Sequence, residues 1–178
     1  MSDFQDRFLV RLSPIGCESL SSWRQRSGLA NDYALYPIPR GTLRRVDPDG
    51  GSNPIDIDWL AKCCNLARDQ ITAMSMAALA NRVFHPTVGV GHPAWILRAR
   101  YSRKDAASGP VYCAHCLATD KQPYFRLEWR VGLITECPIH AVELDEKCPH
   151  CGAGIWPHGA TRSDLFRDKR IPMGHCHF

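Results

Sequence analysis

The C-terminal part of the sequence contains three close pairs of metal-ligating residues. Two are C-x2-C pairs and one is a C-x2-H pair: Cys113 with Cys116, Cys148 with Cys151, and Cys137 with His140. A gap of two residues lets a tight turn direct both side chains at one ion. Three thiolates and one imidazole complete a tetrahedral zinc site and leave no position for water, which is typical of structural rather than catalytic zinc. The first predicted Zn2+ site therefore consists of Cys113, Cys116, Cys137 and His140.

The remaining C-x2-C pair predicts a second zinc site that is incomplete. We expect Cys148 and Cys151 to converge with Cys176 on one ion. A partner of Cys176 at the same spacing would fall past residue 178. The fourth ligand is therefore either a residue beyond this sequence or a histidine within it, with candidates His158, His175 and His177.

The other three cysteines, Cys17, Cys63 and Cys64, have no partner at this spacing. We expect them to be small buried residues. Nine cysteines in an intracellular chain favour metal binding over disulfides.

Composition and charge exclude several classes of protein. The chain has 178 residues, of which 44% are hydrophobic and 22% charged, as in ordinary globular domains. No apolar window is long enough to predict a membrane span, and the opening MSDFQDRFLVRLS lacks the apolar run of a signal peptide. The net charge of +4 lies in residues 1–112, and each zinc site with three thiolates would subtract one further charge. Affinity for nucleic acid must then come from local basic patches.

Three helices are predicted in the N-terminal part. Residues 19–28 form a short helix with Leu20 and Trp23 on one face and Gly28 at its end. Residues 53–64 and 66–74 carry two apolar patterns separated by Asn65, which is the outline of a helix-turn-helix. If this unit binds DNA, the contacts come from the start of its second helix, at Arg68, Gln70 and Thr72. The alternative is a pair of antiparallel helices without that function.

Two further basic segments are candidate contact surfaces. Arg98, Arg100, Arg103 and Lys104 could follow a phosphate backbone, although a solvated linker explains them equally well. Residues 123–130 are predicted as a helix with an aromatic core face. Arg126 and Arg130 then form an exposed basic face.

These elements predict a small, mainly α fold. Residues 1–92 form a helix-turn-helix domain, residues 93–112 a linker and residues 113–178 a tandem zinc-finger or zinc-ribbon-like region.

Several motifs accompany the cysteine framework. They read Gly-Cys-Glu-Ser-Leu at 16–20, Pro-Ala-Trp-Ile at 93–96, Tyr-Cys-Ala-His-Cys at 112–116, Pro-Tyr-Phe-Arg at 123–126 and Trp-Arg at 129–130. With them the sequence resembles the TniQ family of transposition proteins. The first motif departs from the family's usual Gly-Glu-Ser-Leu by the insertion of Cys17.

The resemblance implies a non-enzymatic adaptor in DNA transposition. Such a protein links a target-recognition module, either attachment-site DNA or an RNA-guided CRISPR effector complex, to an AAA+ ATPase filament that recruits the transposase. It implies two zinc ions, a bacterial cytoplasmic protein associated with the nucleoid, and no contact with a membrane. Candidate partner contacts are Glu18, Trp23, Arg126 and Arg130.

The absence of catalytic motifs agrees with this expectation. The sequence has no Gly-rich Lys-Ser/Thr nucleotide loop and lacks the His-x-Glu and Pro-Cys-x-x-Cys elements of zinc deaminases. The main alternative is a zinc-containing helix-turn-helix transcription regulator that binds one specific duplex without partners. An enzyme would instead require zinc with an exchangeable water.

Overall fold

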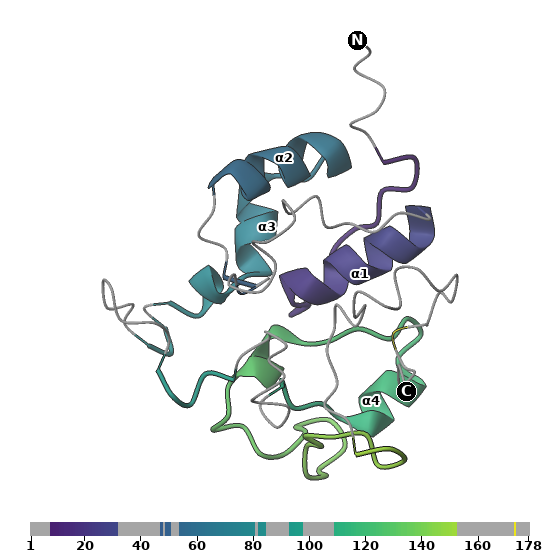
Figure 1. Cartoon of the computed structure of the whole chain (residues 1–178), viewed down its shortest axis with the longest axis vertical. Helices are drawn as coiled ribbons and strands as arrows, with labels where there is room; N and C mark the ends of the chain where they lie inside the picture. The colour runs from purple at the N-terminus through teal and green to yellow at the C-terminus, as the bar shows by residue number, and fades with distance from the viewer. Residues whose placement is uncertain are drawn as a thin grey trace.

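The computed structural model describes residues 8–31, 47, 49–50, 54–80, 82–84, 93–97, 109–152 and 173. Within these residues the regular elements are helices: Leu20–Asn31 (α1), Pro54–Cys64 (α2), Arg68–Ala73 (α3) and Ala114–Thr119 (α4), with 3-10 turns at Met76–Ala78 (η1) and Leu127–Arg130 (η2). Extended segments of the described residues meet only at isolated bridges. The expected small, mostly helical fold is confirmed at this level (Figure 1).

Helix α1 begins with a serine cap and is buried along most of its length. The Oγ of Ser19 accepts a hydrogen bond from the Ser22 backbone N–H at 3.2 Å, which satisfies one of the first free donors of the helix. Gly28 lies inside the helix and does not end it. The helix continues to Asn31, whose amide donates to the carbonyls of Ser27 and Val10. This side chain anchors the last turn to the segment before the helix.

Helices α2 and α3 follow one another across a tight turn at Asn65. Pro54 opens α2, where a missing N–H costs nothing. Asn65 has a φ of 54°, the left-handed conformation that asparagine tolerates better than most residues. Two helices joined by a turn are therefore present, whereas the helix-turn-helix domain and its DNA binding stay predictions.

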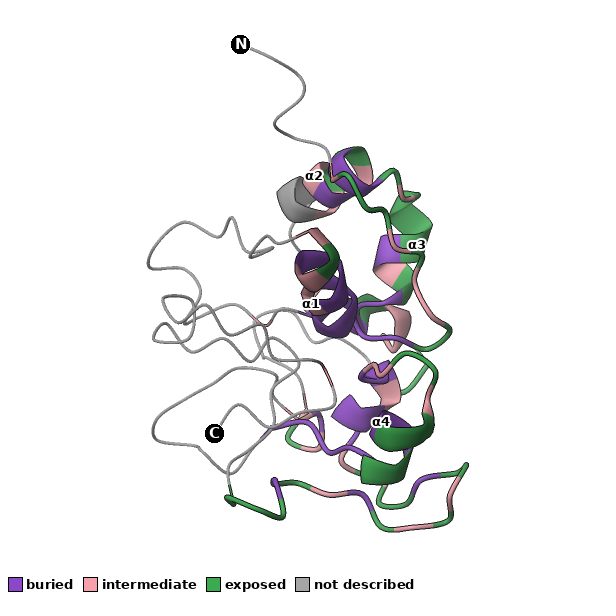
Figure 2. Ribbon diagram, turned by 90° about the vertical axis from the view of Figure 1, so that its right-hand side faces the viewer, coloured by how far each residue is buried: buried purple, intermediate pink, exposed green. Residues whose placement is uncertain are grey.

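One apolar cluster joins α1 to the α2–α3 pair. Its buried members come from all three helices and the turn after α3: Leu20, Trp23, Leu60, Cys63, Cys64, Ile71 and Met74. Full burial of a leucine-sized side chain stabilises the fold by about 1.5–3 kcal/mol. Figure 2 shows α1 buried along most of its length, between α2–α3 and the segment that carries α4.

A second apolar cluster lies beneath α1 and includes the cysteines of the first predicted zinc site. It contains Val111, Tyr112, Cys113, Cys116, Leu117, Phe125, Trp129, Cys137 and Leu144. Both described ends of the predicted linker pair with this part of the chain. The N–H of Leu97 donates to Arg130, and that of Val111 donates to Trp129. The domain boundaries stay a prediction.

Candidate metal centre

Helix α4 positions the first two ligands. Cys113 is its N-cap residue, and its Sγ accepts a hydrogen bond from the Cys116 backbone N–H at 3.4 Å. Cys116 lies one turn into the helix on the same side. Both residues are fully buried. The same short helix therefore fixes two sulfurs toward one point.

A tight chain reversal positions the other two ligands. The N–H of Cys137 donates to Val142, and the N–H of Ala141 donates back to Cys137, each at 2.8 Å. Ala141 takes a φ of 50°, which lets the chain turn sharply after His140. The two ligand pairs are joined by the antiparallel bridge between Tyr112 and Asp145, which exchange backbone hydrogen bonds at 2.8 and 2.9 Å.

The four ligand atoms of Cys113, Cys116, Cys137 and His140 lie within 4.8 Å of one another. The Sγ atoms of Cys116 and Cys137 are 3.6 Å apart. The Nδ1 of His140 lies 3.3 Å from the Cys116 sulfur and 3.6 Å from each of the other two. Tetrahedral zinc, with bonds of about 2.3 Å to sulfur and 2.0–2.1 Å to nitrogen, sets separations of about 3.8 Å between sulfurs and about 3.6 Å between sulfur and nitrogen. The donor set therefore fits a tetrahedral metal ion.

The electrostatics of the two central thiols differ. Burial, together with the neighbouring thiols of Cys137 and Cys113, raises the pKa of Cys116 to about 12. For Cys137 burial acts in the same direction, but hydrogen bonds from the backbone N–H groups of His140 and Ile139 and from the His140 ring lower its pKa to about 6. A cation bound between the four ligands would stabilise both thiolates.

The cysteines of the centre are packed in an apolar cluster, and the charge of the buried Arg126 acts on Cys116. The three cysteines belong to the buried cluster with Phe125 and Trp129, and only His140 is partly exposed. With four protein ligands the coordination sphere is complete. The arrangement fits a structural metal site, and the chemistry of three sulfurs and one imidazole suits zinc.

Comparison with known proteins gives the family. The sequence matches the TniQ family over residues 9–144, which is most of the chain and includes all four ligands of the centre. The chain is a TniQ family protein. It is thereby associated with transposition, and the expected family resemblance is confirmed. No curated protein matches the sequence.

The second predicted metal site lies past the TniQ match. Cys148 is buried and Cys151 is exposed, and the N–H of Gly152 donates to the Cys148 carbonyl at 2.8 Å, closing a turn around the pair. Cys176, His158, His175 and His177 lie outside the described residues. Two of the proposed ligands are thus on one turn, and the second site stays a prediction.

Three of the residues expected to contact DNA are described by the structure, and all three lie on α3. Each interacts with a residue of α2, of α3 or of the turn between them. Arg68 is exposed and pairs with Asp58 at 2.6 Å. The side-chain oxygen of Gln70 accepts from the Ala67 N–H at 3.0 Å, and the hydroxyl of Thr72 donates to the Arg68 carbonyl. Arg98, Arg100, Arg103 and Lys104 lie outside the described residues.

All four expected partner contacts are buried, so the expectation that they form an exposed surface is wrong. Trp23 has no exposed area, and its ring N–H donates to the Leu12 carbonyl. Glu18 is 1% exposed and binds Arg26 through both carboxylate oxygens at 2.7 Å. These two buried side chains hold α1 in place through hydrogen bonds within residues 12–26.

The two arginines are also internal, and residues 123–130 do not form a helix of the expected length. Arg126 precedes the 3-10 turn η2, pairs with Asp120 at 3.0 Å and stacks on Tyr124 and Trp129. Arg130 ends the same turn and is 1% exposed. The expected core position of Trp129 is confirmed.

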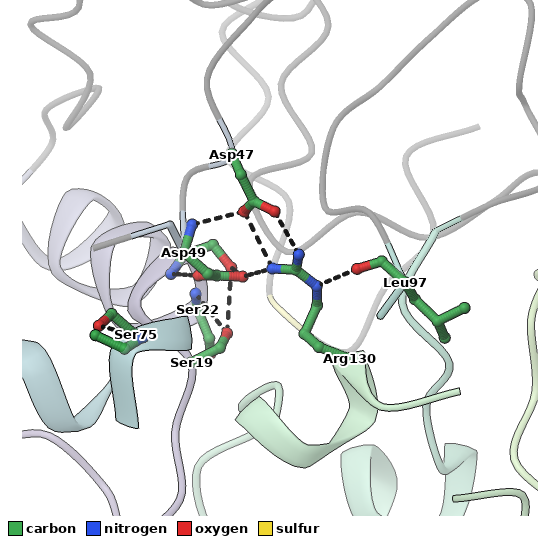
Figure 3. A network of polar contacts seen from close by, with 9 residues as sticks. Ser19, Ser22, Asp47, Asp49, Ser75, Leu97 and Arg130 are labelled. Carbon is green, nitrogen blue, oxygen red and sulfur yellow. Dashed lines mark hydrogen bonds and ion pairs between the residues drawn. The ribbon is translucent and has the colours of Figure 1, made fainter. Parts of the chain in front are cut away.

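The partners of Arg130 are two aspartates from a distant loop, which sequence reasoning missed. Its guanidinium binds Asp47 and Asp49, each at 2.5 Å, and its Nε donates to the Leu97 carbonyl (Figure 3). Asp49 in turn accepts hydrogen bonds from the N–H and hydroxyl of Ser21 in α1. A separation of 81 residues between Asp49 and Arg130 leaves no local sequence signal for this contact.

The cysteines outside the metal sites divide into two kinds. Cys63 and Cys64 are buried as expected, and burial together with the neighbouring thiol of Cys63 raises the pKa of Cys64 to about 12. Cys17 is exposed, so its expected burial is wrong. The described part of the chain contains no helix long and apolar enough to cross a membrane.

Proposed function

We propose that this TniQ family protein is a non-enzymatic adaptor in DNA transposition, which links a target-recognition module to an AAA+ ATPase filament that recruits the transposase. The observation that carries the proposal is the family match over residues 9–144, because it spans both the α1–α3 helices and the complete metal centre.

A structural role for the metal centre supports the absence of catalysis. Its four protein ligands leave no coordination position for a substrate or a water molecule. When bound there, Zn2+ would supply structural cross-linking of α4 to the turn at Cys137. The nearby charges of Arg126 and Arg130 are paired with aspartates.

The contact with nucleic acid belongs in this proposal to the N-terminal part and the basic segment after it. Arg68, Asp69 and Gln70 lie exposed on α3, which follows the turn at Asn65. This position is where helix-turn-helix proteins place their contacts with bases. This surface does not distinguish between the two target modules, attachment-site DNA and an RNA-guided effector complex.

The direct test is co-sedimentation with the AAA+ ATPase on DNA. The purified protein, loaded with Zn2+, should pellet with ATPase filaments formed on duplex DNA and remain in the supernatant with DNA alone at the same salt concentration. If the protein pellets only when ATPase filaments are present, the result supports the adaptor function. Tight binding to one short duplex without the ATPase would instead support a transcription regulator, which the family match does not favour.

A further inference from the structure

The segment between the two ligand pairs connects the metal centre to helix α1. On one side, the ring of Phe125 is buried with Cys113, Cys116 and Cys137 and packs edge-on against Trp129 at a centroid distance of 5.7 Å. On the other side, the backbone of the same segment pairs with the residues that start α1. The segment thus contacts both the cysteines of the metal centre and the start of the helix.

Backbone hydrogen bonds form the first part of this connection. The N–H of Ser19 donates to Phe125 at 2.9 Å, and the N–H of Leu127 donates to Cys17 at 2.7 Å, on either side of an antiparallel bridge between Glu18 and Arg126. The N–H of Phe125 donates to the hydroxyl of Ser22 at 2.9 Å. The cap and first turn of α1 therefore rest on residues 125–127.

Buried charges form the second part. The hydroxyl of Ser22 also donates to Glu18, which is bound by Arg26 inside the helix. Asp49 joins the first turn of α1, through Ser21, to Arg130 at the end of η2 (Figure 3). These groups are fully or almost fully buried, and each would lose partners or gain water if η2 moved.

The position of η2 is in turn set by the ligand turns. Trp129 lies in the cluster around the cysteines, and its carbonyl accepts the N–H of Val111, two residues before Cys113. Arg126 pairs with Asp120, the residue that ends α4. Without a metal ion, three thiols and an imidazole would meet at contact distance with only weak hydrogen bonds to hold them.

We infer that helix α1 is ordered only when the Cys113–Cys116–Cys137–His140 centre holds its metal. Metal binding at one end of the molecule thereby controls the packing of α1 against α2 and α3, which lie on its other side. The metal centre would then act on the N-terminal helices as well as on the segment that contains its ligands.

Thermodynamic linkage gives a sharp test. If α1 is ordered only in the metal-bound state, a variant that weakens α1 without touching a ligand must weaken metal affinity by the same factor. If α1 is ordered in both states, the variant destabilises both equally and the affinity does not change. Ser22→Ala removes the acceptor for Phe125 and the donor to Glu18, so its zinc affinity, measured by competition with a chromophoric chelator, should fall about tenfold.

Ser27→Ala is the matched control. It is the same substitution in the same helix, at a buried hydroxyl that has no hydrogen-bond partner in the described structure. Its zinc affinity should equal that of the wild type. Wild-type zinc affinity in Ser22→Ala would overturn the inference.

Hydrogen exchange on the wild-type protein provides an independent readout that requires no variant. Removal of the metal with a chelator should increase exchange at the amides of α1 by at least tenfold, together with those of α4. Simultaneous loss of protection in α2 would support the same dependence. Retained protection of α1 while α4 exchanges freely would overturn it.

Discussion

The sulfur of Cys116 lies in contact with ligand atoms from the opposite turn, at 3.6 Å from Cys137 and 3.3 Å from His140. At this position a hydroxyl cannot replace the thiolate, because serine binds zinc poorly at neutral pH. Cys116→Ser should therefore abolish stoichiometric zinc binding and leave the region around α4 unfolded. Structural zinc sites contribute about 10–16 kcal/mol in small zinc-finger peptides, comparable to the stability of a whole domain.

The measurement is metal content by elemental analysis together with near-UV circular dichroism. Cys17→Ser is the matched control, since Cys17 is exposed and lies outside the ligand set. The Cys17→Ser variant should bind the same amount of zinc at the first site as the wild type. A Cys116→Ser protein with full zinc content at that site would show that this thiol is not a ligand.

The buried charge of Arg130 leads to a second prediction at the residue scale. Arg130→Met leaves Asp49 buried without its cation, and breaking a buried ion pair in this way costs about 3–5 kcal/mol. Denaturant unfolding of the metal-bound protein should report that loss. The double variant Arg130→Met with Asp49→Asn should recover part of it, because the fully buried carboxylate is then replaced by a neutral amide, and the remaining carboxylate of Asp47 is partly exposed. Equal stability of the single and double variants would argue against a direct interaction.

The ligands were predictable from sequence, whereas the environments of the two arginines were not. A C-x2-C or C-x2-H pair is a local pattern, since the turn that brings both side chains together is only four residues long. Arg126 and Arg130 also stand four residues apart, but their burial is decided by Asp120 and by the distant Asp47 and Asp49. Such contacts depend on tertiary structure and leave no local periodic signal.

At the scale of elements, the turn between α2 and α3 depends on the backbone conformation of Asn65. An alanine in the left-handed region costs roughly 1–2 kcal/mol more than a residue that tolerates it, whereas glycine adopts it freely. Asn65→Ala should therefore lower the unfolding free energy by about 1 kcal/mol and Asn65→Gly should leave it nearly unchanged. Thermal unfolding of the two metal-bound variants, compared at equal zinc occupancy, checks this difference. Equal melting temperatures for both variants would contradict the assigned conformation.

Helices α1 and α2 were predictable because their own sequences contain the signals. Leu20 and Trp23 mark one face of α1, and Pro54 marks the first turn of α2. The expected helix over residues 123–130 was wrong for a different reason. The backbone of residues 125–127 is used in bridging to residues 17–19, so only the short turn η2 remains helical. Spacing of side chains alone does not reveal that competition.

At the scale of the whole molecule, the proposed contact of α3 with DNA has a measurable electrostatic signature. Arg68→Ala should reduce the salt dependence of assembly on DNA by about one unit of slope if Arg68 neutralises a phosphate. Gln70→Ala should change sequence preference with little change of slope, since an amide carries no charge. The control is Arg82→Ala, another exposed arginine, which lies past η1. If the slope is unchanged in Arg68→Ala, Arg68 does not contact a phosphate, and its ion pair with Asp58 is its described interaction.

The overall arrangement of the chain was only partly accessible from sequence. The described ends of residues 93–112, expected to be a linker, pair with residues 129–131 through Ile96, Leu97 and Val111. Close approach also constrains Gly132, because a Cβ there would lie 3.0 Å from the Trp95 carbonyl oxygen. Neither contact can be predicted from composition. A segment with proline and glycine is predicted as a loop both when it is exposed to solvent and when it packs against the rest of the protein.

The hydrogen bond between Ser22 and Phe125 spans 103 residues of sequence. During synthesis on the ribosome, at roughly 5–20 residues per second, the residues of the first turn of α1 are made about 5–20 s before Phe125, whose N–H binds Ser22. Throughout that interval residues 17–19, at the start of α1, lack the backbone partners that residues 125–127 supply. The polar groups that begin α1 therefore stay open to water for seconds, until residues 125–127 are synthesised.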